Sequence, residues 1–206
     1  PACASSFESL LYAINVTSLA SILFAIQIYC DFSGYSTIAI GAAEVMGFQL
    51  MDNFDCPYLS QSVSEFWRRW HISLSSWFKD YLYIPLGGNR KGKVRKYVNI
   101  MIVFLVSGLW HGANWSYVVW GGLNGLYQVL GAIFTTVKRK VKEKICVRKN
   151  FLPITLVNML ITFIVVDFAW IFFRADTMQH AFAVIDRFFH MIDQVLLANG
   201  TLYDLG

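Results

Sequence analysis

The feature that most constrains the fold is a series of long apolar runs that carry almost no charge. Residues 115–134 form a run of 20, and residues 151–173 form another. Runs of this length match the roughly 30 Å hydrocarbon core of a bilayer at about 1.5 Å of helical rise per residue. Only 15% of the 206 residues are charged, against about 25% in a soluble domain. The sequence therefore predicts an all-α, polytopic membrane protein.

The N-terminal apolar stretch contains a polar interruption. Residues 9–29 are predicted to span the membrane, and residues 37–50 form a second apolar stretch. Between them, "YCDFSGYS" holds Asp31 and Gly34, which we expect to break the helix. Acidic residues at this depth face protein or water rather than lipid.

Residues 60–88 differ in kind, since they are too charged to span and too aromatic for a simple loop. Ser64 is expected to cap a helix that begins at Glu65, with Glu65 and Arg69 four residues apart. Phe66, Trp70 and Trp77 would share one broad face. This pattern favours an interfacial or re-entrant helix with its aromatic rings at headgroup level. Pro85 and the following glycines end it.

The positions of the basic residues predict the topology. Twelve of the 17 Lys and Arg lie in two segments, 90–96 and 138–149. Short loops rich in Lys and Arg stay cytoplasmic, so the helices between them, 97–110 and 115–134, should form a hairpin whose tip points outward. Residues 178–198 read as an amphipathic helix rather than a span, with apolar side chains recurring on one side.

The tip of this hairpin carries a histidine in "SGLWHGANW". The 14 residues 97–110 rise about 21 Å, which is short of the roughly 30 Å hydrocarbon thickness. His111 should therefore lie inside the membrane, followed by non-helical backbone. Such backbone survives only when it is buried in protein or lines a water-filled cavity. Gly108 and Gly112 would allow close backbone approach, and His111 is predicted to lie at the floor of a cavity.

Several residues are candidates for a site, each with a structural alternative. An ionisable residue in a membrane interior is a functional candidate by default, so catalysis is favoured for His111 over a packed, hydrogen-bonded role. For His71, a catalytic role and a structural role as a hydrogen-bonded residue at the membrane interface are equally favoured. For Asp31 and Asp167, structural pairing is favoured over a functional role. Asp167 would pair with Arg174 or with another helix. His180 and His190 are expected to be solvated. The candidate substrate-binding residues are Asn114, Trp110, Trp67 and Asp31.

Several chemistries find no support in the sequence. The four cysteines are widely spaced without a C-x-x-C pair, and the histidines lack H-E-x-x-H spacing, so neither a disulfide framework nor a metal site is predicted. Phosphate-binding, dinucleotide-binding and nucleophile-elbow motifs are also missing. General-base catalysis fits best: an imidazole with a pKa of about 6.5 can take the proton of a hydroxyl that attacks an activated acyl group.

Four long segments resemble the membrane-bound O-acyltransferase (MBOAT) family, in its alginate- and polysaccharide-acetylating branch. They are "QIYCDFSGYSTIAIG", "NFDCPYLSQSVSEFWRRWHISLSSWFKDYLYIPLGGNRKG", "SGLWHGANWSYVVWGGLNG" and "DFAWIFFRA", which together extend over nearly three quarters of the chain. The resemblance implies an acyltransferase whose essential histidine corresponds to His111, with His71 as a second active-site residue. It also implies a ring of helices around a thin centre, with a tunnel from a cytoplasmic donor to an outer funnel.

The resemblance and the topology together give the expected function. An acyl group, acetyl in this branch, would pass from a cytoplasmic thioester of coenzyme A or a carrier protein to an extracytoplasmic polysaccharide. Asn114 or His71 would orient the carbonyl or stabilise the oxyanion. We expect no bound cofactor, no nucleic acid, a lipid environment in a bacterial inner membrane, and a periplasmic acyltransferase as partner. The alternatives are D-alanyl transfer to teichoic acids and a transporter or scaffold without chemistry, although no matched pair of broken helices is apparent.

Residues 1–206 are expected to form a single membrane domain that is the C-terminal half of a larger one. The chain opens with Pro1 and shows no signal peptide, and the resemblance implies further N-terminal helices that would complete the ring. Such a piece should not act alone.

Overall fold

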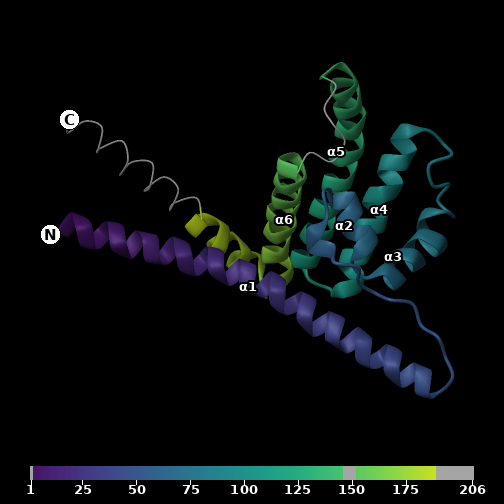
Figure 1. Ribbon diagram of the computed structural model, residues 1–206, viewed down its shortest axis with the longest axis horizontal. Coiled ribbons are helices and arrows are strands. Elements are labelled where there is room, and N and C mark those ends of the chain that lie inside the picture. Colours follow the sequence, from purple (N-terminus) through teal and green to yellow (C-terminus); the bar gives the residue numbers. More distant parts are fainter. Residues whose placement is uncertain (1, 146–151, 189–206) are drawn as a thin grey trace.

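A computed structural model describes residues 2–145 and 152–188 of the chain, and these residues are helical apart from short connections. The longest element, α1 (Ala2–Val45), crosses one side of a bundle in which α5 (Trp115–Ile145) lies between α4 (Lys93–His111) and α6 (Leu152–Arg174) (Figure 1). Two short helices, α2 (Val63–Arg69) and α3 (Ile72–Phe78), pack beside them. The predicted all-α class is confirmed.

Three helices are long and apolar enough to cross a membrane in the part of the chain that the structure describes. They cover Val16–Val45, Trp115–Thr135 and Leu152–Arg174. Many of their large apolar side chains, among them Leu19, Leu130 and Leu160, are exposed. Surfaces of this kind suit lipid, since a bilayer removes the cost of apolar side chains that face outward. The predicted spans of the second half are confirmed.

The predicted interruption at residues 29–36 is wrong, because α1 continues through it without a break. A single glycine inside a helix costs only about 1 kcal/mol relative to alanine, and Gly34 has open space around it. Asp31 is exposed on the helix surface and needs no break to reach solvent. The 44 residues of α1 rise about 66 Å, about twice the hydrocarbon thickness.

Several predicted helix boundaries also need correction. The cap of α2 is Ser62 rather than Ser64: its hydroxyl accepts a hydrogen bond from the Glu65 backbone N–H. α4 begins at Lys93 instead of residue 97, and α5 continues to Ile145, through most of the second basic segment that was expected to be a loop. Lysine and arginine are good helix formers, so a basic run does not end a helix. Residues 146–149 lie outside the described residues.

The predicted interfacial helix is in fact two helices. α2 ends at Arg69, and α3 starts at Ile72 after His71, whose φ of 46° lies in the left-handed region. The expected common face is therefore divided: Phe66 and Trp70 stack in the core at 5.4 Å between ring centroids, whereas Trp77 is exposed. A π-type turn, Lys79–Tyr83, continues α3. Pro85 and the glycines follow as an irregular turn, as predicted.

The C-terminal amphipathic helix is partly described. Residues 178–188 are helical, with Ala181 fully buried and Phe182 exposed. The remainder of the predicted segment, with Phe189, His190, Ile192 and Leu196, lies outside the described residues.

Glycines let the two helices of the hairpin, α4 and α5, approach each other closely, as predicted for Gly108. A Cβ at Gly108 would collide with the Tyr117 carbonyl, and a Cβ at Gly121 would collide with the Phe104 carbonyl. Gly112 is different, because a Cβ there would meet the Tyr117 ring at 2.7 Å. Small residues that let two backbones touch are a common device of membrane helix packing. This contact fixes the distance between the two helices.

Gly121→Ala should therefore destabilise the protein by about 1–3 kcal/mol, because the added methyl group must push α4 away from α5. Gly131→Ala on the same helix is the control: nothing lies within 4 Å of its Cβ position, so helix propensity should make it neutral or stabilising by up to about 1 kcal/mol. Thermal unfolding in detergent compares the two. Equal melting temperatures would contradict the close contact.

Candidate active site

His71 and His111 face the same cavity, which has a volume of about 370 Å³. One face of α4 lines its length, through Ile100, Val103, Phe104, Ser107 and His111. From Ile100 to His111 the helix rises about 16 Å. The other walls come from α1, α2, α3, α5 and α6. The cavity is therefore long, and it is lined by segments from throughout the described chain.

His111 is the last residue of α4, and aromatic rings surround it. Its imidazole lies 5.1 Å from the Trp120 ring and 5.2 Å from the Phe173 ring, measured between centroids, with both contacts edge-on. Tyr117 and Trp110 lie close by. Its ring nitrogens form no hydrogen bond with the residues that the structure describes. The imidazole is thus held by packing, and its nitrogens remain available to a bound molecule.

His71 lies at the break between α2 and α3, outside the three candidate spans. Its Nδ1 is 3.4 Å from the Asn53 Oδ1, and the Phe32 ring contacts it edge-on at 4.6 Å between centroids. Burial, together with the nearby His111, lowers the pKa of His71 from 6.5 to about 4. The side chain is therefore neutral at pH 7.

Trp67 forms part of the cavity wall. Its Nε1 donates a hydrogen bond of 3.2 Å to Oδ1 of Asn124 on α5, a residue that is only 1% exposed. Its ring also packs edge-on against Phe104 and Trp120. Since its only polar atom is already bonded, Trp67 offers an apolar ring surface to the cavity.

Three other predicted substrate-binding residues lie away from this cavity. Asn114 caps α5, because its Oδ1 accepts from the Ser116 N–H at 3.0 Å while its Nδ2 donates to the Asp176 carbonyl at 2.8 Å. Trp110 is 60% exposed on the outer side of α4. Asp31 lines a second, more open pocket of about 500 Å³.

The second pocket adjoins the cavity. Ile28, Phe32 and Phe173 line both spaces. Tyr117, which contacts His111, lines the second pocket with Arg174 and Asp176. His111 therefore lies next to the boundary between a mostly apolar cavity and a more open pocket that carries charged side chains.

The predicted pairing of Asp167 with Arg174 does not occur in the described part of the chain. The Arg174 guanidinium lies over the Phe24 ring, 5.8 Å from its centroid. Asp167 faces Ser21 of α1, and its Oδ1 is buried without a hydrogen-bond partner among the described residues. No group of His, Cys, Asp and Glu suited to a metal ion is found within the same residues.

Sequence reasoning missed several residues of the site. Ser107, Trp120 and Phe173 line the cavity, and so do the cations Arg68 and Lys79. Asn53, which contacts His71, was also missed. The helical spacing of Ser107 and His111, four residues apart, is a signal that could have identified Ser107. The others come together only through the tertiary fold.

The fold and cavity define a helical integral membrane protein with two histidines facing one cavity. The sequence profile of the membrane-bound O-acyltransferase (MBOAT) family matches residues 5–173, and the chain belongs to this family. It is 42% identical to a probable alginate O-acetylase AlgI of Pseudomonas syringae pv. tomato over 79% of this chain and 29% of that protein.

Other relatives have different acceptors in their names. A peptidoglycan O-acetyltransferase of Helicobacter pylori is 40% identical over 81% of this chain and 30% of its own length. A teichoic acid D-alanyltransferase of Bacillus subtilis is 27% identical over 76% of this chain and 40% of its own. The chain thus spans less than half the length of these curated relatives.

Trp67→Phe should destabilise the protein by about 1–3 kcal/mol, because the buried Asn124 Oδ1 would lose its indole donor. Trp77→Phe is the matched control, since Trp77 is 53% exposed and a surface substitution usually changes stability by no more than about 0.5 kcal/mol. Unfolding in detergent, followed by tryptophan fluorescence and circular dichroism, measures both. A Trp67→Phe protein as stable as the control would contradict the wall contact.

Proposed function

We propose that this chain provides the catalytic histidines of a membrane O-acyltransferase that acetylates an extracytoplasmic polysaccharide in a bacterial inner membrane. The observation that carries the proposal is the shared cavity of His71 and His111. The walls of this cavity are mostly apolar, and an apolar site limits the access of water, which would otherwise hydrolyse an activated acyl group. The relatives that are 40–46% identical to the chain are O-acetylases or an O-acetyltransferase by name.

We infer the direction of acyl transfer from the positions of the basic residues. The end of α4 that begins in the basic segment 90–96 would lie in the cytoplasm, because short basic loops stay there. Lys79 and Arg68 line the cavity, where they can attract the phosphates of a thioester donor such as acetyl-coenzyme A or a carrier protein. The acceptor would approach from the second pocket, beyond Phe32 and Phe173. A periplasmic acyltransferase that relays the acyl group to the polymer is the proposed partner.

The chemical step needs one base and one acyl carbon. A ring nitrogen of His111 takes the proton of the acceptor hydroxyl while the oxygen bonds to the thioester carbonyl carbon. The tetrahedral intermediate then collapses, the C–S bond breaks, and the leaving thiolate takes the proton back from the imidazolium. His71 would act as a second catalytic residue. Asn114 is a weaker candidate for the oxyanion, because both ends of its amide are engaged in holding α5.

His111→Gln in the full-length protein should lower acyl transfer about 10²- to 10⁴-fold, the usual contribution of a positioned general base. His180→Gln is the control, since His180 is exposed and does not line the cavity. Acyl esters on the cell-surface polymers are measured by mass spectrometry, with the membrane level of each variant determined in parallel. Full acylation by a well-expressed His111→Gln protein would exclude the proposed role.

The same measurement separates acetyl from D-alanyl transfer, because the two esters differ in mass. Acetyl esters that disappear with His111→Gln would support the proposal. D-alanyl esters that disappear instead would assign the chain to the other activity, which its lower identity to the teichoic acid enzymes makes the second candidate.

A further inference from the structure

Asn53 lies behind His71, on the side away from the cavity. His71 lines the cavity, whereas Asn53 and Ser73 do not. The Asn53 Oδ1 is 3.4 Å from the His71 Nδ1, and it accepts hydrogen bonds from the Ser73 hydroxyl at 2.6 Å and from the Ser73 N–H at 3.2 Å. One amide oxygen thus accepts hydrogen bonds from Ser73 at the start of α3 and also contacts the ring of His71.

The orientation of the Asn53 amide is not arbitrary. A backbone N–H can only donate, so the atom that faces the Ser73 N–H must be the oxygen. The amide nitrogen then points to the Ser36 hydroxyl of α1, which accepts its hydrogen bond at 3.3 Å. A flipped amide would lose the bond from the Ser73 N–H, because two donors would then face each other, whereas the hydroxyls of Ser36 and Ser73 can donate or accept.

This orientation determines where the proton of His71 lies. An amide oxygen only accepts, so the Nδ1 that faces it must carry the hydrogen. A neutral imidazole has one N–H, which leaves a lone pair on Nε2. Burial favours the neutral form of His71. Since Asn53 holds the Nδ1 side, the lone pair of Nε2 is directed away from Asn53 and toward the cavity.

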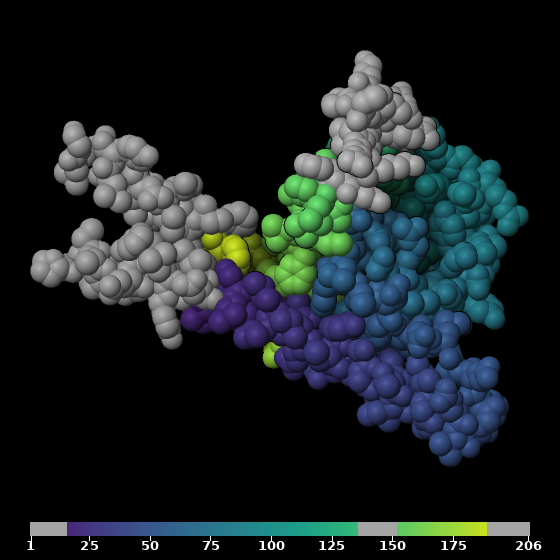
Figure 2. Space-filling model, viewed as in Figure 1, coloured from purple at the N-terminus to yellow at the C-terminus, as the bar shows by residue number. Residues whose placement is uncertain are grey.

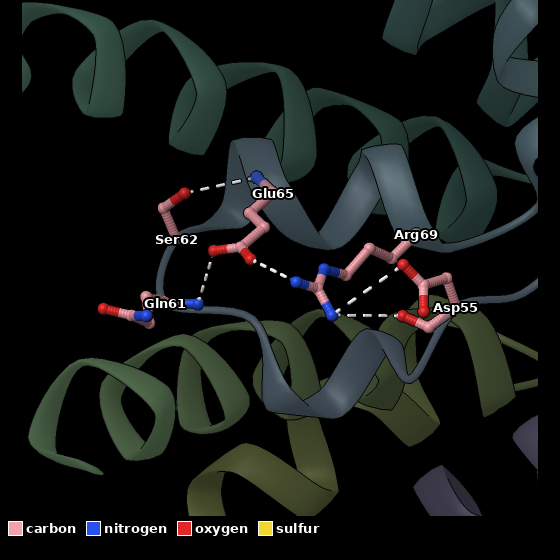
Figure 3. A network of polar contacts seen from close by, with 5 residues as sticks. All are labelled: Asp55, Gln61, Ser62, Glu65 and Arg69. Atoms are coloured by element: carbon pink, nitrogen blue, oxygen red, sulfur yellow. Dashed lines mark hydrogen bonds and ion pairs between the residues drawn. The ribbon is translucent and has the colours of Figure 1, made fainter. Parts of the chain in front are cut away.

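Backbone pairing brings Asn53 to this position. The Asp55 N–H donates to the Arg69 carbonyl at 3.0 Å, and the Ile72 N–H donates to the Asn53 carbonyl at 3.1 Å. Figure 3 shows the polar network beside this pairing, in which Arg69 contacts both Glu65, at 2.8 Å, and Asp55. Segment 53–55 is thus attached to the end of α2, and the left-handed backbone of His71 turns its ring toward Asn53.

We propose that Asn53 is a positioning residue that keeps the proton of His71 on Nδ1 and presents the lone pair of Nε2 to the reacting groups. The meaning of this arrangement for catalysis rests on the proposed acyl transfer. In that reaction Nε2 of His71 accepts a hydrogen bond from a donor group of the bound substrates other than the attacking hydroxyl, whose single proton goes to His111. His71 does not donate a hydrogen bond to an oxyanion.

The tautomer can be observed without any activity measurement. In the full-length protein with ¹⁵N-labelled histidine, the His71 signals are assigned by their loss in His71→Gln. We expect a protonated Nδ1 and an unprotonated Nε2 at pH 7, in both the unaltered protein and Ser73→Ala. Ser73→Ala removes the hydroxyl bond to Asn53 but keeps the amide oxygen. Asn53→Ala should give a mixture of tautomers. A proton on Nε2 in the unaltered protein would overturn the inference.

The pH dependence of acyl transfer gives a second test. Asn53→Asp keeps an acceptor oxygen but adds a negative charge, which favours the charged form of His71 and raises its pKa. The charged or titratable groups that share the cavity with His71 are His111 of α4, Arg68 of α2, and Lys79 and Tyr83 after α3, and this variant leaves them unchanged. Because neutral His71 is required, the acid limb of the rate profile should move up by about 1–3 pH units.

Ser73→Ala, which has the same neighbours, should leave the acid limb where it is. Asn53→Ala should lower the rate about 10- to 100-fold, because a misplaced catalytic group costs up to about 10²-fold. An Asn53→Asp profile identical to that of Ser73→Ala would reduce Asn53 to a structural cap of α3. If His111→Gln and His71→Gln retain full activity, the proposed function fails, while the tautomer measurement still decides the role of Asn53.

Discussion

The close approach of α4 to α5 is the constraint on which the rest of the structure depends. Gly108 and Gly121 let the two backbones touch, and only three residues separate the end of α4 at His111 from the start of α5. The helix end therefore presents the imidazole to Trp120 of α5. Trp120 in turn stacks on Trp170 of α6, at 5.9 Å between ring centroids. Two glycines thus determine which rings the histidine meets.

Much of the fold could be predicted because a bilayer leaves few alternatives. Apolar runs near 20 residues with basic flanks have to be helices, and two apolar runs separated only by the four residues 111–114 have to form a hairpin. Helix ends were harder to predict. Nothing in the lipid-facing pattern says that α4 starts at Lys93 or that Gly34 leaves α1 intact, since the energies involved are about 1 kcal/mol and packing decides them.

The residues of the site also differ in how well the sequence predicts them. His111 and Trp67 stand out locally, because an imidazole beside glycines or an indole beside cations is unusual in a membrane segment. Asn53 gives no local signal. It meets His71, 18 positions away, only because segment 53–55 pairs with the end of α2. The break at His71 has the same origin: a left-handed backbone at a non-glycine residue persists only when surrounding contacts enforce it.

The two histidines are held by different forces, and this difference has chemical consequences. Four aromatic rings contact His111 and no hydrogen bond holds it within the described residues, so its orientation is set by packing and its nitrogens are left for a ligand. The ring of His71 is set by a polar partner that also fixes its proton. Groups held in place before the reaction need no reorganisation during it. A cavity with one imidazole oriented by packing and the other by a hydrogen bond therefore has both rings in position before any ligand arrives, which is what the proposed acyl transfer requires.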